Sequence, residues 1–142
     1  MKRICVIDGQ GGGIGSTVIR KIRELLGESV EIFALGTNAI ATAQMLKARA
    51  NRGASGENAI VQTTARVDII VGPLAIVLAN AMMGEVTPSI AAAVAGSRAQ
   101  KVLLPITQEN VQIVGTSADP LPHLVEQLVE VDLKRLLQQE VS

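Results

Sequence analysis

Short apolar runs alternate with longer segments of helical periodicity along this chain. Four short runs are largely apolar, which predicts buried strands at 4–7, 30–35, 67–71 and 102–106. Apolar residues recur three or four positions apart in two long segments, which predicts amphipathic helices at 14–26 and 121–137. Between these two helices we expect four more. One follows the second strand and ends at about residue 50, and the others cover 57–65, 74–83 and 88–96. Such alternation favours a parallel sheet with helices on both faces.

A fifth apolar run, 111–114, follows the fourth strand after a very short connection, 107–110. A connection of this length permits a hairpin and is too short for a parallel crossover. The sequence therefore predicts an α/β fold: a Rossmann-like three-layer sandwich with a mostly parallel five-stranded sheet and an antiparallel edge strand. The expected strand order, numbered along the chain, is 2-1-3-4-5. We expect residues 1–142 to form a single domain, with Gly53–Gly56 as a loop.

Composition excludes several classes of protein. The chain has 13 Lys and Arg residues and 13 Asp and Glu residues, so it has no basic excess for nucleic-acid binding. It also has one Phe and no Tyr or Trp on which bases could stack. The single cysteine, Cys5, cannot form an internal disulfide and suits a reducing compartment. No apolar stretch is long enough to span a membrane, and the N-terminus does not resemble a signal peptide. We therefore expect a cytoplasmic protein without nucleic-acid or membrane partners.

The segment between the first strand and the first helix is the most informative one. It consists of Asp8, Gly9, Gln10, Gly11, Gly12, Gly13, Ile14 and Gly15. Glycines let the backbone approach a ligand closely, and the N–H groups that begin a helix can bind phosphate. A tight turn without a ligand is the alternative, but five glycines in seven residues lose more conformational entropy than such a turn requires. The segment therefore favours a ligand site, and the bare turn remains open.

The glycine spacing of this segment is G-x-x-x-G-I-G, which resembles the cofactor loop of short-chain dehydrogenases/reductases. Three features differ from that family. Asp8 replaces the threonine before the first glycine, and Gly72-Pro73-Leu74-Ala75 replaces an Asn-Asn-Ala-Gly motif after a later strand. The catalytic Tyr-x-x-x-Lys is impossible because the chain has no Tyr. Membership of that enzyme family is therefore excluded.

A second resemblance extends over most of the chain. It is carried, in order, by DGQGGGIG, ALGTNA, GENAI, VDIIVGP and GEVTP. These segments resemble a family of small stand-alone bacterial proteins that contain a domain of unknown function. The resemblance implies a Rossmann-like domain and does not imply a particular activity.

The end of the second strand bears on the identity of a nucleotide. Dinucleotide sites commonly place an acid there to hold the ribose hydroxyls, whereas this chain has Thr37 and Asn38 and no Arg for a 2′-phosphate. Both residues can hydrogen-bond a ribose, and either can cap the following helix. NAD(P) is therefore one candidate ligand among nucleotides, without a specific signature.

The carboxyl ends of parallel strands meet at one edge of a sheet, where ligands collect. Loop residues expected at this edge are Asp8, Gln10, Thr37, Asn38, Gly72 and Pro73, and further candidates are Glu57, Asn58 and Glu85. Asp8, Glu57 and Glu85 could form a carboxylate set for acid–base chemistry or for Mg²⁺. Alternatively, the two glutamates are ordinary exposed residues and Asp8 accepts N–H bonds from the glycine segment. His123 has no second ligand nearby in the sequence, so we expect no metal site.

Three hypotheses about function follow. The first is a nucleotide- or phosphoryl-ligand-binding protein that acts as a sensor or accessory subunit. The second is a small NAD(P)- or nucleotide-dependent enzyme that uses Asp8, Glu57 or Glu85, and the third is a ligand-free interaction scaffold. The apolar segment 74–83 and the leucine-rich face of 121–137 exceed what one small sheet should cover, which predicts a homodimer.

Overall fold

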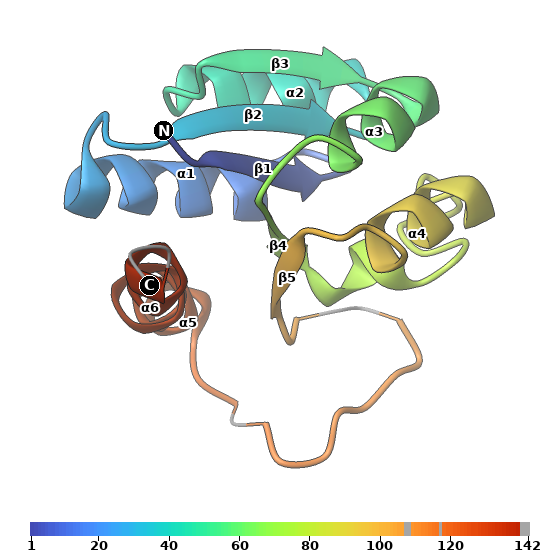
Figure 1. Ribbon diagram of the computed structural model, residues 1–142. Coiled ribbons are helices and arrows are strands. Elements are labelled where there is room, and N and C mark those ends of the chain that lie inside the picture. The colour runs from blue at the N-terminus through green and yellow to red at the C-terminus, as the bar shows by residue number, and fades with distance from the viewer. Residues whose placement is uncertain (107–108, 117, 140–142) are drawn as a thin grey trace.

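A computed structural model describes residues 1–106, 109–116 and 118–139 of the chain (Figure 1). Five parallel strands form one sheet in the order β3-β2-β1-β4-β5. The strands are β1 (Arg3–Asp8), β2 (Glu31–Gly36), β3 (Arg52–Ser55), β4 (Ile69–Pro73) and β5 (Gln100–Leu104). This arrangement confirms the expected parallel, Rossmann-like α/β sheet. The first four predicted strands are β1, β2, β4 and β5 of the structure. Their predicted order, 2-1-3-4, is confirmed as β2-β1-β4-β5.

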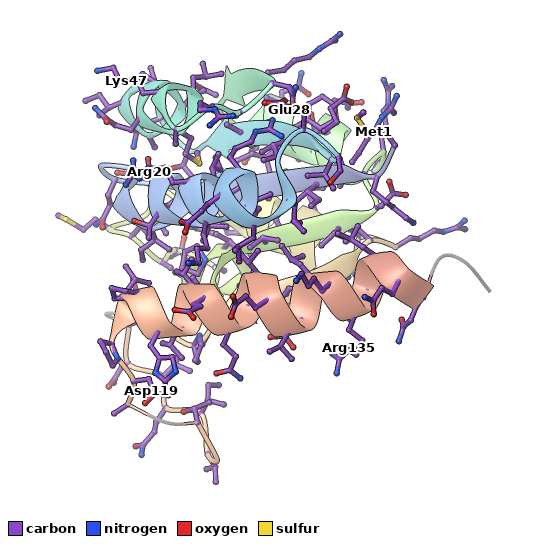
Figure 2. The ribbon with its side chains drawn as sticks, turned by 90° about the vertical axis from the view of Figure 1, so that its left-hand side faces the viewer. Met1, Arg20, Glu28, Lys47, Asp119 and Arg135 are labelled. Carbon is purple, nitrogen blue, oxygen red and sulfur yellow. The ribbon has the colours of Figure 1, made fainter. Side chains whose placement is uncertain are left out.

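Helices cover both faces of the sheet. The elements are α1 (Gly13–Leu26), α2 (Ala39–Lys47), α3 (Glu57–Thr64), the 3₁₀ turn η1 (Leu74–Val77), α4 (Pro88–Ala95), α5 (Leu121–Gln127), the π-helical η2 (Leu128–Leu133) and α6 (Lys134–Gln138). The last three follow one another directly and form the predicted C-terminal helix. Figure 2 shows this helix lying alongside α1 on one face.

Alternation of side chains along the central strand builds two separate cores. Ile4 and Val6 of β1 pack in the core under α1, α2 and the C-terminal helix. Cys5 and Ile7 point to the other face and pack under α3, η1 and α4. Burial raises the pKa of the Cys5 thiol far above its ordinary value, so Cys5 is an inert core residue.

The fifth strand was predicted wrongly. Residues 111–114 form no strand; they are exposed, and Val114 is 95% exposed. The fifth strand is instead β3, at the edge of the sheet opposite β5, within a segment that the sequence indicated to be a loop, and β3 pairs parallel to β2. Its composition is unfavourable for a strand, and all four of its residues are exposed. β3 is therefore held by backbone pairing to β2, whereas residues 111–114 do not pair with the free edge of β5 despite their apolar side chains.

The predicted helix 74–83 was also wrong. After the single turn of η1 the backbone enters the left-handed region at Asn80, Met82 and Met83, with φ of 70°, 56° and 56°. The Asn80 N–H donates to the carbonyl of Val86 at 2.7 Å, which closes the segment into a compact loop. Ala75 and Ile76 are buried under the sheet, so the hydrophobicity of this segment reflects burial rather than a continuous helix. In the part of the chain that the structure describes, no helix is both long and apolar enough to cross a membrane.

Candidate functional site

The loops after β1, β2 and β4 meet at the carboxyl edge of the sheet (Figure 1). From β1 the chain continues through α1 to β2 on one side, whereas β4 lies on the other side. The crevice between the ends of β1 and β4 is therefore the topological switch point, where ligands bind in open α/β sheets.

The carboxyl group of Asp8, at the end of β1, lies against the N-terminus of α1. Its Oδ1 accepts the N–H of Gly9 at 2.8 Å and its Oδ2 accepts the N–H of Gly15 at 2.7 Å. Burial raises the pKa of Asp8, and hydrogen bonds from Gly15, Gly9 and Ile14 offset this only in part; the charge of Glu85 raises it further. The carboxyl group thus takes helix N–H groups that a phosphate would otherwise use.

The glycines of the loop have different roles. Gly12 has φ of +74°, and a Cβ there would lie 2.8 Å from the carbonyl oxygen of Ala41. A Cβ on Gly9 would lie 2.5 Å from the Met82 sulfur, and one on Gly15 would meet Met45. Packing and backbone conformation therefore account for these three glycines.

Packing does not account for Gly11 and Gly13. Both are exposed, and a Cβ at either position would have no heavy atom within 4 Å. Neither has a positive φ. Close approach of a ligand is a physical reason for glycine at these two positions.

The carboxylate of Glu85 bridges the glycine loop and the end of β2. Its Oε1 accepts three hydrogen bonds: from the N–H of Gln10 at 2.8 Å, from Thr37 Oγ1 at 2.6 Å and from Asn38 Nδ2 at 2.9 Å. Partial burial raises the pKa of Glu85, but the hydrogen bonds from Thr37, Gln10 and Asn38 outweigh it and leave the pKa below its ordinary value. Glu85 is thus an ionised carboxylate that ties the two loops together.

Asn38 has the capping role that the sequence left open for Thr37 and Asn38. Asn38 caps α2, because its Oδ1 accepts the N–H of Ala41 at 2.8 Å. Its Nδ2 donates to Glu85 and to the carbonyl of Gln10, the latter at 3.0 Å. Glu85 therefore brings a carboxylate to the end of β2 from a segment that adjoins β2 only in the folded chain.

A cavity of about 380 Å³ lies at the switch point. It is lined by Gln10, Ile14, Pro73, Ala75, Asn80, Met82, Met83, Ile106 and Glu109. The N–H of Met82 donates to Glu109 Oε1 at 2.8 Å, which joins the loop before Glu85 to the segment after β5. This lining includes no Lys or Arg. The cavity thus combines apolar walls with amide and carboxylate groups.

A family model described as a domain of unknown function, DUF3842, matches residues 3–137. The chain belongs to the DUF3842 family. No curated protein and no solved structure matches the sequence. The match extends from β1 into α6, so the whole carboxyl edge with its glycine loop and cavity lies within the DUF3842 domain.

The remaining candidates have other positions in the DUF3842 domain. Glu57 Oε1 accepts a hydrogen bond from the hydroxyl of Thr87, and Asn58 is exposed in the first turn of α3. Gly72 is buried in β4, where a Cβ would lie 2.5 Å from the carbonyl oxygen of Ile7. Within the described ranges, no group of three acidic, His or Cys side chains could hold a metal ion. The structure therefore brings Asp8 and Glu85 near each other and leaves Glu57 with a different partner.

Several lining residues of the cavity were missed by sequence reasoning. Asn80, Met82 and Met83 fall in the segment that was predicted to be a helix. Ile106 ends the predicted fourth strand, and Glu109 lies in the short connection after it. No motif marks them. Glycine after an Asn-x-Met-Met segment was a weak signal of left-handed backbone, since Asn and Gly tolerate that conformation best.

Proposed function

We propose that this DUF3842 protein binds a nucleotide or another small phosphorylated ligand at the carboxyl edge of its sheet. The observation that carries the proposal is the cavity of about 380 Å³ at the switch point, beside the glycine loop. Its volume lies in the range of small-molecule sites, about 300–1,000 Å³. We assign it a sensor or accessory role, in which binding itself is the function.

The lining of the cavity suits a nucleoside. Gln10 and Asn80 carry amides that both donate and accept hydrogen bonds, as the edge of a base requires. Ile14, Pro73 and Met82 supply apolar surface for a planar ring or a sugar. This combination of apolar walls and a few polar groups is typical of small-molecule pockets.

The phosphate would contact the exposed backbone at Gly11 and Gly13. Gly13 is the first residue of α1, so its N–H has no partner within the helix. On the β2 side, Met82 and Glu85 lie directly against Gly9. A mononucleotide therefore fits the observed arrangement better than a dinucleotide such as NAD(P), which would need both side chains to move.

An enzymatic role would require an acid or base that reaches the ligand. Asp8, Glu57 and Glu85 do not line the cavity, whereas Glu109 does. Asp8 and Glu85 instead hold the loops through hydrogen bonds to their N–H and side-chain donors. These contacts support binding ahead of catalysis.

The test is ligand-dependent melting of the full chain, followed by calorimetry. A nucleotide present at about 100 times its Kd should stabilise the protein by about 2.7 kcal/mol. In calorimetry, Gly13→Val should lose binding at the carboxyl edge, because its side chain would occupy the ligand's approach. The variant should still fold, because no heavy atom lies within 4 Å of the new Cβ.

The matched control is Ala65→Val, which adds a similar volume at an exposed position after α3, toward the opposite edge of the sheet. This variant should keep the full ligand shift. The proposal is wrong if millimolar NAD(H), NADP(H), ATP, GTP and nucleotide sugars leave the wild-type melting temperature unchanged. It is also wrong if Gly13→Val binds as well as Ala65→Val does.

A further inference from the structure

A second cavity, of about 290 Å³, lies at the amino edge of the sheet. It is lined by Arg3, Glu31, Phe33, Arg52, Gln62, Thr63, Arg66 and Val67. None of these residues belongs to the glycine loop or to the first cavity. The lining includes three arginines and the single aromatic side chain of the protein.

Strand register places four of these residues on one face of the sheet. Arg3 pairs with Glu31, and Phe33 pairs with Arg52, on neighbouring parallel strands. Cys5 lies in the core under α3, so Arg3, two residues earlier, points to that same face. The side chains of β1, β2 and β3 thus converge where the strands begin.

The end of α3 forms the other wall of the cavity. It contributes Gln62 and Thr63, and the chain continues through Arg66 toward β4. Because α3 has only eight residues, it leaves Phe33 half-buried. The aromatic ring is therefore part of an accessible wall rather than of a closed core.

The charges around this cavity are unbalanced. Glu31 Oε1 lies 3.5 Å from Arg3 Nε, which pairs one arginine with the one acid of the lining. In the part of the chain that the structure describes, the side chains of Arg52 and Arg66 have neither an ion pair nor a hydrogen bond. Two guanidinium groups thus remain to attract an anion. The first cavity, in contrast, has a glutamate and no cation in its lining.

We propose that this cavity binds a phosphorylated small molecule with a planar ring, such as a nucleoside phosphate. Arg52 and Arg66 hold the phosphate oxygens, because guanidinium groups bind phosphate through paired hydrogen bonds. Phe33 provides the face on which the ring stacks. This site is separate from the glycine loop and does not depend on the proposed function of the carboxyl edge.

The test is isothermal titration of the full chain with ADP and, separately, with inorganic pyrophosphate. Arg52→Gln and Arg66→Gln should each weaken the binding of both probes about tenfold, the effect of one lost charge-assisted contact. Phe33→Leu should weaken ADP about tenfold and leave pyrophosphate unchanged, because pyrophosphate has no ring to stack. Circular dichroism of each variant would confirm that it is folded.

Two control variants show whether binding is specific to this cavity. Arg20→Gln removes an exposed arginine from α1, on the other face of the sheet, and should leave both affinities unchanged (Figure 2). Gly13→Val should also leave this binding intact, whatever happens at the carboxyl edge. The proposal is overturned if wild type does not bind pyrophosphate at millimolar concentration, or if Arg20→Gln weakens binding as much as Arg52→Gln.

Discussion

The buried side chain of Arg23 joins three connections of the fold, and its replacement tests this role. Arg23 is 5% exposed. Its Nε donates to the carbonyl of Arg49 at 2.9 Å, and its Nη1 donates to the carbonyls of Gly27 and Val30 at 3.0 and 3.1 Å. Its Nη2 donates to Asn51 Oδ1 at 2.6 Å. The guanidinium therefore connects the end of α1, the start of β2 and the loop before β3.

Arg23→Met keeps the apolar stem and removes all four hydrogen bonds. The Val30 bond is buried, so its carbonyl oxygen is left unpaired, whereas the other three acceptors are partly buried and can be rehydrated in part. An unpaired buried group costs about 1–3 kcal/mol, and each of the other bonds about 0.5–1.5 kcal/mol. We therefore expect a loss of about 3–5 kcal/mol in unfolding free energy and a drop in Tm of about 10 °C.

The assay is urea unfolding followed by far-ultraviolet circular dichroism, because the chain has no Trp or Tyr for fluorescence. Arg20→Met is the matched control: Arg20 is exposed on the same helix and should change stability by less than about 0.5 kcal/mol. Arg23→Lys should recover only part of the loss, since one ammonium cannot reach all four acceptors. The reasoning fails if Arg23→Met unfolds within about 1 kcal/mol of Arg20→Met.

Two further predictions concern pH and assembly. Folding raises the pKa of Asp8. Between the pKa of the unfolded chain and that of the folded chain, the folded chain therefore binds more protons than the unfolded chain, and the free energy of unfolding should fall as pH rises through this range. Melting across a pH series should lose this component in Asp8→Asn, and an unchanged profile would contradict it. The homodimer also stays a prediction; Met83 and Val131, from the two apolar segments on which it rests, are exposed. Light scattering at tens of micromolar should give twice the chain mass of 14.8 kDa, and a monomer mass would refute it.

Local patterns in the sequence determined most of the secondary structure. Short, largely apolar runs indicated β1, β2, β4 and β5, and periodicity indicated α1 and the C-terminal helix, because burial on one or both faces imposes a repeat on neighbouring residues. Cap positions were also readable: Asn38 accepts the N–H of Ala41, and Thr87 accepts the N–H of Ile90. Each of these features depends on residues within a few positions of one another.

Only the tertiary structure decided the edge of the sheet and the composition of the two cavities. β3 pairs with β2 although its four residues are exposed, whereas the apolar run 111–114 does not pair with the free edge of β5. Glu85 reaches Thr37 across 48 positions, and Arg52 joins Phe33 through strand register. Such contacts leave no local repeat in the sequence, since they depend on how the sheet brings distant loops together. The glycine loop and the candidate carboxylates Asp8 and Glu85 were therefore visible from the sequence, but the partners of Glu85, the cavity beside the loop and the arginine-lined cavity were not.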